Sequence, residues 1–332
     1  NINVTLEEGL IGGASWNKHG TYCTDDVLRK VSKANATLVG AVGGPEWDDK
    51  HHSGSIIDSD GLMRLRIELD LYNALRPIRS WKPLVNQTPY RPEVIKDTDL
   101  LIVRENCGGI YVGEPRGRDH VSKTHYRAYE TCEYNTMQIE RIARSAFEMA
   151  QNRRKQVTSL DKSNVLESGK LWRETVDKIG NTEYPDIKLT HLLMDYALFA
   201  VNMNPYSFDV LLADNLFGDL MSDMTGAIAG SLGMLPSATL PTRVRKGHQI
   251  RGGVYEPTHG SAPDISGKGI ANPIGTILSV AMMFEYAFCR SDLSQLIELA
   301  VEKALFSGFK TPDLGGDETT QSVADAICAN IN

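Results

Sequence analysis

The sequence predicts an α/β fold, and three observations support this prediction. Short apolar runs rich in β-branched residues alternate with longer segments whose apolar residues recur at helical spacing. Such alternation is typical of sheets covered by helices. The chain has 332 residues, enough for one large or two ordinary domains with full cores. No internal repeat or low-complexity tract interrupts the pattern.

The predicted elements follow one another along most of the chain. We expect strands at 36–42, 99–105, 155–161, 187–195 and 208–214. We expect helices at 61–72, 137–154, 164–180 and 216–230, and three more at 272–288, 293–309 and 319–331. The stretches 112–136 and 239–256 lack periodicity, and we expect them to be loops.

The composition narrows the classes of function. The formal net charge of −7 argues against a nucleic-acid partner. The longest apolar stretch, 274–288, is too short to span a bilayer, so we expect no membrane partner. Five scattered cysteines without metal-binding spacing indicate a reducing compartment. No targeting pattern is visible, and we expect a cytoplasmic protein, with an organelle left open if a transit segment was removed.

Three arginines suit a small polycarboxylate ligand. Arg66 lies at the edge of an apolar helix face, next to an apolar lip of Leu62 and Met63. Arg76 lies just past this predicted helix, and Arg104 ends a predicted strand, where open α/β sheets bind ligands. Guanidinium groups bind carboxylates through paired hydrogen bonds. The alternative for Arg66 is a snorkelling side chain whose stem covers the core.

Three aspartates predict a site for a divalent cation. Asp219 and Asp223 lie one helical turn apart, where like charges repel each other. Asp195 closes a predicted strand. Ligands that are all oxygen favour Mg²⁺ or Mn²⁺, and a bound cation would relieve the repulsion. The alternative is a pair of solvated aspartates on a helix surface.

A lysine and a tyrosine are candidates for proton transfer. Lys162 lies between a predicted strand and a helix that we expect Ser163 or Asn164 to cap. A lysine that is held among cations and partly desolvated can act as a base. Tyr111 follows a glycine pair that allows close approach of the backbone. The alternatives are a surface lysine and an ordinary half-buried tyrosine.

The segment YEPTHGSAPDISGKGIANP, residues 255–273, is rich in glycine and runs into a predicted helix. We expect Asn272 to be the N-cap and Pro273 the first helical residue. Such a loop before a helix N-terminus is suited to phosphate. Asp264 would accept hydrogen bonds from a ribose diol and repel a 2′-phosphate, which favours NAD over NADP. The segment lacks the G-x-G-x-x-G fingerprint, so a standard Rossmann domain is not predicted. The alternative is a long structural loop.

Seven motifs, in order, resemble the β-decarboxylating dehydrogenases, the isocitrate/isopropylmalate dehydrogenase family. They are LIGGASWNKHGTY, LVGAVGGPEWD, VRENCGGIYVGEPRG, VTSLDKSNVLES, NLFGDLMSD, GSLGMLPSA and YEPTHGSAPDISGKGIANP. The resemblance implies a two-domain α/β fold that differs from a Rossmann domain. A cofactor-binding domain would comprise 1–72 and 230–332, and a substrate, metal and dimerisation domain would comprise 73–229.

The resemblance also implies roles for individual residues. The substrate would contact Leu62, Met63, Arg66, Arg76, Arg104, Asn164, Val165 and Asp195. NAD would contact Gly43, Gly44, His259, Gly260, Ser261, Ala262, Pro263, Asp264, Ile265 and Asn272. Mg²⁺ or Mn²⁺ would be held by Asp219 and Asp223 together with Asp195 from a second subunit. Lys162, from that same second subunit, would take the hydroxyl proton and Tyr111 would help protonate the enol, which implies a homodimer with shared active sites.

The reaction implied by the resemblance is the NAD-dependent oxidative decarboxylation of 3-isopropylmalate to 4-methyl-2-oxopentanoate and CO₂ in leucine biosynthesis. The apolar pair Leu62 and Met63 fits an isopropyl group and cannot pair a third carboxylate. GGIY after VREN also resembles the isopropylmalate branch. The alternatives are a relative that acts on homoisocitrate, isocitrate, tartrate or malate, or a non-catalytic family member.

The sequence departs from the family pattern in three places. It lacks the N-terminal strand and glycine-rich loop of the family, and we expect the native protein to have them. Where the family has a glutamate, seven residues before Arg66, this chain has Ser59, flanked by Asp58 and Asp60. The segments 116–134 and 242–251 look longer than usual, as surface loops allow.

Overall fold

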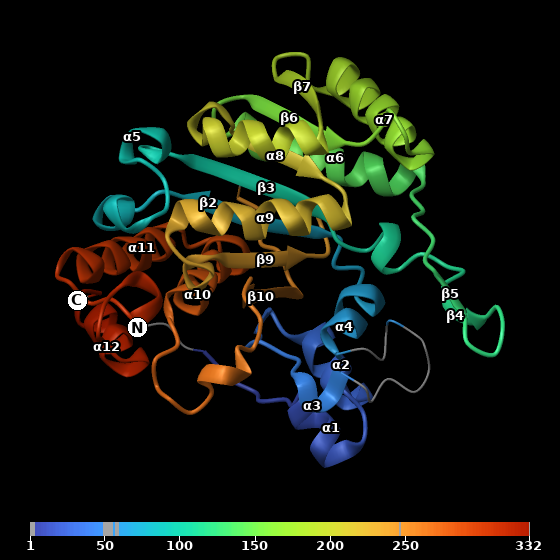
Figure 1. Cartoon of the computed structure of the whole chain (residues 1–332). Helices are drawn as coiled ribbons and strands as arrows, with labels where there is room; N and C mark the ends of the chain where they lie inside the picture. Colours follow the sequence, from blue (N-terminus) through green and yellow to red (C-terminus); the bar gives the residue numbers. More distant parts are fainter. Residues whose placement is uncertain (1–3, 49–55, 57–59, 246, 332) are drawn as a thin grey trace.

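The computed structural model describes residues 4–48, 56, 60–245 and 247–331. Its main feature is a mixed eight-stranded sheet in the order β1-β10-β9-β2-β3-β8-β6-β7 (Figure 1). The strands are β1 (Ala36–Leu38), β2 (Asn73–Arg79), β3 (Asp99–Glu105), β6 (Gln156–Asp161), β7 (Lys188–Leu193), β8 (Val210–Ala213), β9 (Pro236–Leu240) and β10 (Gly253–Pro257). The predicted α/β fold is confirmed.

Strand direction divides this sheet into two parts. β3, β8, β6 and β7 are parallel, so their carboxyl ends share one edge. β2 and β9 form antiparallel pairs between β3 and β10, and β1 is parallel to β10. The segments that follow β1 and β10 therefore leave at the edge opposite to those that follow β3, β6, β7 and β8.

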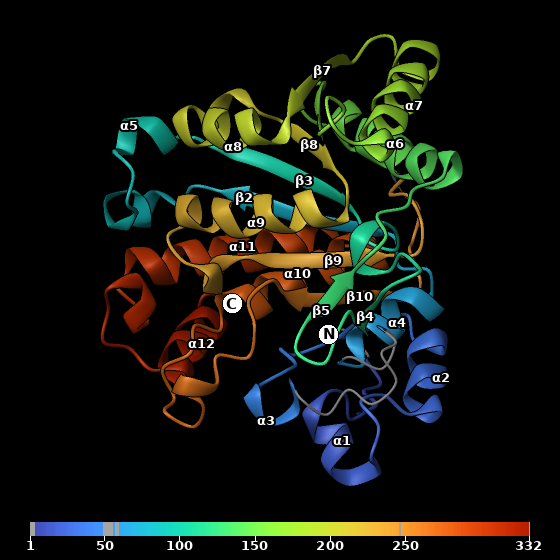
Figure 2. The ribbon, with the colours of Figure 1, turned by 45° about the vertical axis from the view of Figure 1, so that its right-hand side comes forward.

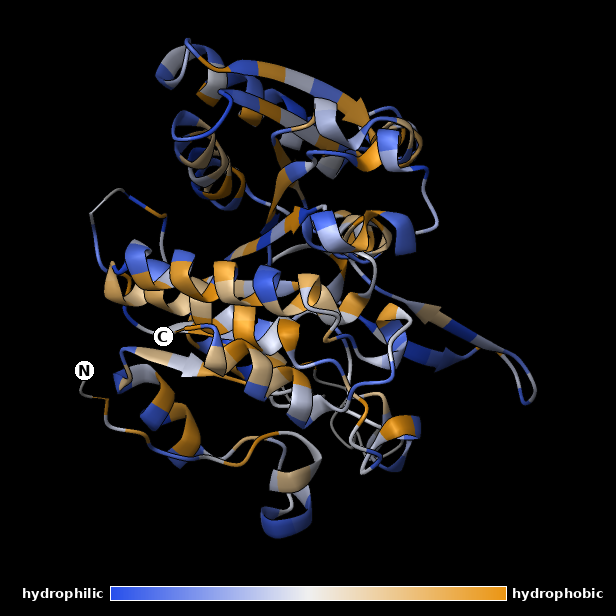
Figure 3. Cartoon of the chain, turned by 90° about the vertical axis from the view of Figure 1, so that its left-hand side faces the viewer, coloured by the Kyte–Doolittle hydropathy of each residue, from blue (hydrophilic) through white to orange (hydrophobic). Residues whose placement is uncertain are grey.

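Alternating side chains of the central strand β3 fill two separate cores. Leu100 and Ile102 face a core shared with α8 (Met194–Met203), α9 (Asn215–Ala229), α10 (Ile274–Phe288), α11 (Ser291–Phe306) and α12 (Thr320–Ala329). Leu101 and Val103 face a core built mainly with α6 (Thr136–Gln151) and α7 (Glu167–Glu183). Burial on both faces explains the unbroken apolar run of this strand. Figure 3 shows apolar residues concentrated on the strands and on the helices beside them.

Three N-terminal helices sit together at one end of the molecule, and the second and third of them pack on a third and smaller core (Figure 2). They are α1 (Gly13–His19), α2 (Asp25–Lys33) and α4 (Leu62–Glu68). The remaining short elements are α3 (Pro45–Asp48), α5 (Pro92–Ile95), β4 (Gly117–His120), β5 (Tyr126–Tyr129), η2 (Lys82–Gln87), η3 (Gly109–Tyr111), η4 (Pro205–Ser207), η5 (Leu232–Met234), η6 (Pro263–Ile265) and η7 (Pro312–Leu314). In the described part of the chain, no helix is long and apolar enough to cross a membrane.

Several expectations about local structure were wrong. Arg76 lies inside β2 rather than just past a helix, and Asp195 lies in the first turn of α8 rather than at the end of a strand. The expected loops contain the hairpin β4–β5 and the strand β10, and the predicted strand at 36–42 ends at residue 38. These strands are short or carry charged residues, so their apolar periodicity is weak. The domain boundaries near 72 and 230 stay predictions.

Candidate active site

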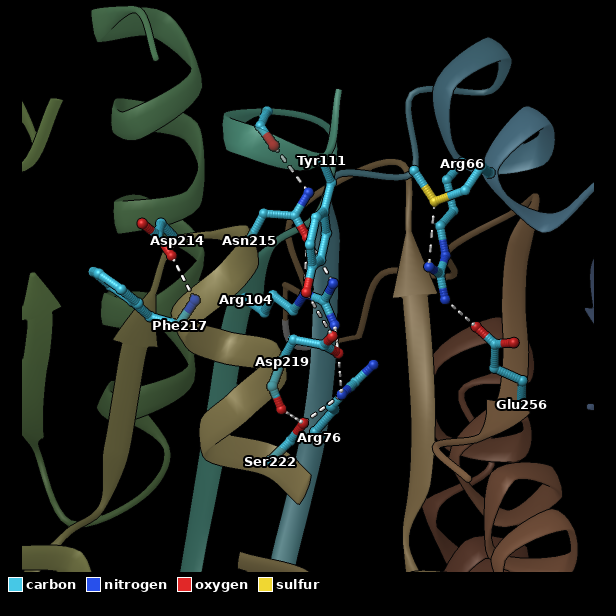
Figure 4. Close-up of polar contacts among 12 residues, drawn as sticks. Arg66, Arg76, Arg104, Tyr111, Asp214, Asn215, Phe217, Asp219, Ser222 and Glu256 are labelled. Atoms are coloured by element: carbon cyan, nitrogen blue, oxygen red, sulfur yellow. Dashed lines mark hydrogen bonds and ion pairs between the residues drawn. The ribbon is translucent and has the colours of Figure 1, made fainter. Parts of the chain in front are cut away.

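Two buried arginines meet one aspartate between β2, β3 and α9 (Figure 4). Arg104, in β3, and Arg76, in β2, both form ion pairs with Asp219 of α9. The distance from Arg76 Nη1 to Asp219 Oδ1 is 3.2 Å. Arg76 also donates a hydrogen bond to the hydroxyl of Ser222, one turn further along the helix. The structure thus gathers residues from three separate parts of the sequence around one carboxylate.

The start of α9 explains how the helix approaches Arg104 so closely. Asp214 is the N-cap, and its carboxylate accepts a hydrogen bond of 2.7 Å from the N–H of Phe217. Burial raises the pKa of Asp214 to about 6. A Cβ atom on Gly218 would lie 2.7 Å from Arg104 Cγ, so the helix can pass the arginine only with glycine at this position.

The electrostatics of this cluster favour an anionic ligand. Burial, helped by the charge of Arg76, lowers the pKa of Arg104 to about 10, and burial also lowers the pKa of Arg76. Although burial opposes it, the two guanidinium charges lower the pKa of Asp219. One carboxylate is left to balance two buried cations, and the buried Nε of Arg76 has no hydrogen-bond partner within the described residues. A dicarboxylate would supply the missing charge and acceptors.

Tyr111 joins the cluster from the glycine-rich turn after β3. Its hydroxyl donates a hydrogen bond of 3.1 Å to Asp219 Oδ2, and its ring lies 5.8 Å from the guanidinium carbon of Arg104. Burial and the carboxylate of Asp219 raise the pKa of this phenol. The phenol is therefore protonated at neutral pH and placed to give its proton to a bound molecule.

Arg66 pairs with a different acid. Its Nη2 lies 2.8 Å from Glu256 Oε1 on β10, and this carboxylate raises the pKa of Arg66 even though burial acts in the opposite direction. The Nε of Arg66 is buried without a partner within the described residues. Leu62 and Met63 are buried beside it, and Met63 Sδ lies 3.7 Å from Arg66 Nη1. An apolar surface therefore borders this arginine, as its position in the sequence predicts.

Lys162 and Asp195 form a separate pair at the carboxyl ends of β6 and β7. Lys162 Nζ lies 2.7 Å from Asp195 Oδ1, and this hydrogen bond lowers the pKa of the exposed aspartate. The expected caps of α7 are wrong, because Leu166 precedes the helix and no side chain caps it. The turn that holds Ser163 and Asn164 is instead fixed by the buried carboxylate of Asp161, which accepts from the N–H of Ser163 at 2.9 Å. Val165, in the same turn, is exposed.

The carboxylates of Asp219 and Asp223 provide part of a site for a divalent cation. In the described ranges, no group of three or more His, Cys, Asp or Glu residues could hold a metal ion within one chain. Asp223 is nevertheless exposed one turn after Asp219 and forms no hydrogen bond or ion pair with the described residues. Partial desolvation and the charge of Asp219 raise the pKa of Asp223, against the effect of Arg76. This donor pair is suitable for a hard cation completed by ligands from outside the chain.

The glycine-rich segment after β10 is largely exposed. His259 Nδ1 lies 2.9 Å from the carbonyl oxygen of Gly260, and Ala262 adopts a left-handed conformation before η6. Ser261, Pro263 and Asp264 are exposed, whereas Ile265 is half-buried. Asn272 is buried, and its Oδ1 accepts from the N–H of Ile274 at 3.0 Å. Pro273, not Asn272, is the N-cap residue, so the helix begins one residue later than expected.

A second glycine segment leaves the same sheet edge. Gly43 and Gly44 follow β1 with positive φ values of 96° and 154°. Because β1 is parallel to β10, both segments emerge from the same edge of the sheet. Asp58 and Ser59 lie outside the described residues. Asp60 accepts a hydrogen bond of 2.9 Å from the N–H of Met63 at the start of α4.

Three buried residues of the site are not predicted from the sequence, namely Glu105, Asn215 and Glu256. Asn215 contacts Arg104, and Glu256 contacts Arg66. Glu105 accepts hydrogen bonds from the N–H groups of Cys107 and Gly108 in the turn that leads to Tyr111. The sequence around each of these residues offers one sign of a role in the site. Each is a polar residue that lies next to a predicted site residue or within an apolar run.

Glu105 predicts a specific dependence of stability on pH. Burial raises its pKa from 4.5 to about 7, although Arg141 opposes this shift. Because the folded-state pKa is the higher one, the carboxyl group stabilises the fold below pH 4.5 and this contribution is lost as the pH rises through 7. We expect the unfolding free energy of the wild type to fall relative to E105Q by about 3 kcal/mol between these limits.

Chemical denaturation at several pH values would measure this difference. The amide of E105Q can still accept from the N–H of Gly108 but cannot ionise. E93Q, at an exposed position, serves as the matched control and should show no such divergence. Parallel curves for wild type and E105Q would contradict the prediction.

Comparisons with known proteins agree with this geometry. A family model described as isocitrate/isopropylmalate dehydrogenase matches residues 1–327. The 3-isopropylmalate dehydrogenase of Anaeromyxobacter dehalogenans is 43% identical over 328 residues, which cover 99% of this chain and 90% of the relative. The 3-isopropylmalate dehydrogenase 1 of Bordetella bronchiseptica is 46% identical over 331 residues, which cover 98% of this chain and 88% of the relative.

Solved structures show the same fold. A crystal structure of isocitrate dehydrogenase from Methylococcus capsulatus superposes with a TM-score of 0.84 at 32% identity, covering 97% of this chain and 88% of the other. A β-decarboxylating dehydrogenase from Thermococcus kodakarensis gives a TM-score of 0.74 at 31% identity, covering 98% of this chain and 86% of the other. The similarity of fold therefore extends over nearly the whole chain.

Proposed function

The chain belongs to the isocitrate/isopropylmalate dehydrogenase family, and we propose that it catalyses the NAD-dependent oxidative decarboxylation of 3-isopropylmalate in leucine biosynthesis. The observation that carries the choice of substrate is the buried apolar pair Leu62 and Met63 beside Arg66. This surface would accept an isopropyl group and leave a third carboxylate unpaired. The names of the curated relatives support the same substrate, whereas one solved neighbour is an isocitrate dehydrogenase.

The arginines orient the substrate in this proposal. Arg76 and Arg104 bind a carboxylate of the malate part, because they are buried, close together and neutralised by one carboxylate alone. Arg66 borders the apolar surface and binds through its unpartnered Nε. Since these side chains are already held by Asp219, Ser222 and Glu256, little side-chain entropy is lost when the substrate binds.

Two residues move protons. Lys162 takes the proton of the substrate hydroxyl as a hydride leaves, and Tyr111 returns a proton to the enol after CO₂ departs. The proton of Tyr111 is retained at neutral pH because its pKa is raised. Asp195 keeps the side-chain nitrogen of Lys162 in place through their hydrogen bond of 2.7 Å.

The cofactors are part of the proposal. NAD⁺ would be held by the glycine-rich segments at 43–44 and 259–265 and by Asn272, and would supply the hydride acceptor. The exposed Asp264 would favour a ribose diol over a 2′-phosphate. Mg²⁺ or Mn²⁺ would be held by Asp219 and Asp223 with a third carboxylate, and would polarise the oxygen atoms of the substrate.

Lys162 and Asp195 are proposed to serve the active site of a second subunit. They form their own pair, and no group of three acidic residues forms within the described part of one chain. We therefore expect K162M and D223N to complement each other. When equal amounts of the two variants are dissociated and reassociated at random, half of the dimers are hybrids. Each hybrid has one intact site out of two, so the mixture should recover about a quarter of wild-type activity. No recovered activity from confirmed hybrids would place both residues in a site within one chain.

The proposed function is tested by NADH formation with 3-isopropylmalate beside isocitrate, homoisocitrate, tartrate and malate. The assay contains NAD⁺ and either Mg²⁺ or Mn²⁺, and a parallel reaction contains a chelator. Turnover of 3-isopropylmalate, abolished by the chelator, is the expected result. Preference for another acid would show that Leu62 and Met63 do not select the substrate. A folded dimer inactive on every acid would favour the non-catalytic alternative.

A further inference from the structure

We propose that Asn215 is a positioning residue that fixes Arg104 and the turn before Tyr111 relative to each other. This inference rests on the proposed function, in which Arg104 binds a carboxylate and Tyr111 returns a proton. Asn215 is the first residue of α9 and is 1% exposed. Its amide lies between β3 and the glycine-rich turn (Figure 4).

The amide oxygen of Asn215 determines which edge of the Arg104 guanidinium is left to bind other groups. Asn215 Oδ1 accepts hydrogen bonds from Nε at 3.1 Å and from Nη2 at 2.6 Å. These two bonds use one edge of the guanidinium and leave Nη1 to pair with Asp219. Without them two N–H groups of the buried guanidinium would lose their shared acceptor, and the group could rotate about its last bonds. Asn215 therefore sets the direction in which Arg104 meets a bound carboxylate.

The amide nitrogen holds the turn that carries Tyr111. Asn215 Nδ2 donates a hydrogen bond of 2.9 Å to the carbonyl of Gly108, and the backbone N–H of Asn215 donates one of 2.9 Å to the hydroxyl of Tyr134. The turn is packed tightly, since a Cβ on Gly108 would lie 2.5 Å from the ring of Tyr134 and Gly109 has a φ of 74°. The same side chain therefore locates both the substrate-binding arginine and the proton donor.

Only an amide makes both connections from this position. A carboxylate would accept from Arg104 but could not donate to the carbonyl of Gly108, and alanine would make neither bond. The two substitutions N215D and N215A thus separate the two connections. Such small displacements of reacting groups cost about ten- to a hundredfold in rate.

The experiment measures kcat and KM for 3-isopropylmalate with the metal- and NAD-supplied dimer. We expect N215D and N215A both to lower kcat by about tenfold or more. KM should also rise by about tenfold in both, because the new carboxylate of N215D neutralises Arg104 and N215A leaves its guanidinium free to rotate. N73A is the matched control, because Asn73 is a buried asparagine whose side chain donates to the carbonyl of Thr242 and contacts neither Arg104 nor Gly108. It should cost stability and leave both constants within about twofold.

A double-mutant cycle decides whether Asn215 acts through Tyr111. In the Y111F background, N215D should lower kcat no further, whereas a general loosening of the fold would multiply the two effects. Multiplicative effects, or unchanged constants in both Asn215 variants, would overturn the inference. If N215A does not fold, N215D and the cycle are sufficient. An inactive wild type would instead refute the proposed function, so the two failures are distinguishable.

Discussion

Replacing Lys162 with methionine is expected to lower kcat by about a thousandfold. The proposed base is the side-chain amine whose nitrogen lies 2.7 Å from Asp195 at the carboxyl ends of β6 and β7. Methionine keeps the length and the apolar stem of lysine but cannot exchange a proton. Because Arg66, Arg76 and Arg104 are untouched, KM for the hydroxy acid should change much less than kcat. Steady-state kinetics of K162M beside wild type measures both constants.

The control for this variant is K170M. Lys170 lies on α7, is exposed, and forms an ion pair with Glu167, so it matches Lys162 in charge and in having an acidic partner. Its substitution should leave kcat within about twofold, as is usual for surface changes. Chemical rescue of K162A by a small amine would identify the missing group as a base. More than a tenth of wild-type kcat in K162M would remove Lys162 from that role.

Sequence patterns predicted the parts of the fold in which the spacing of the apolar residues alone indicates a helix or a strand. The strand at 99–105 was predicted with its observed bounds, because burial on both faces leaves an unbroken apolar run. β2 was not predicted, because its sequence NALRPIR contains two arginines and a proline and its apolar residues do not alternate with polar ones. Arg76 is stable inside that strand because Asp219, which is 143 residues away in sequence, supplies its counter-charge. No local pattern can report such a distant partner.

The same limit applies to the candidate site. The sequence named Arg104, Asp219 and Tyr111 separately, and the structure joins them through hydrogen bonds and ion pairs. It could not show that Arg66 would pair with Glu256, because these residues are 190 positions apart and come from α4 and β10. Nor could it identify Asn215, whose contacts with Arg104 and Gly108 each span more than a hundred residues. The residue types were visible in the sequence, whereas their partners were set by strand order.

Substituting Asp223 with asparagine is expected to weaken the binding of Mg²⁺ or Mn²⁺ by about a hundredfold. Asp223 is the better test of the metal site than Asp219. Asp219 neutralises two buried arginines and accepts from Tyr111, so D219N would also disturb folding. Asp223 is exposed and has no hydrogen bond or ion pair within the described residues, so D223N removes one proposed ligand and little else.

Thermal unfolding at increasing metal concentration measures this change without any turnover. A ligand that binds only the folded state raises the melting temperature as its concentration exceeds its dissociation constant. Wild type should therefore be stabilised at metal concentrations that leave D223N unchanged. In chelator D223N should melt no lower than wild type, because it lacks the repulsion between the two aspartates. D186N, at an exposed aspartate in the loop before β7, should respond as the wild type does. Equal stabilisation of D223N and wild type would mean that the cation is held elsewhere. The placement of two carboxylates one helical turn apart would then need another explanation.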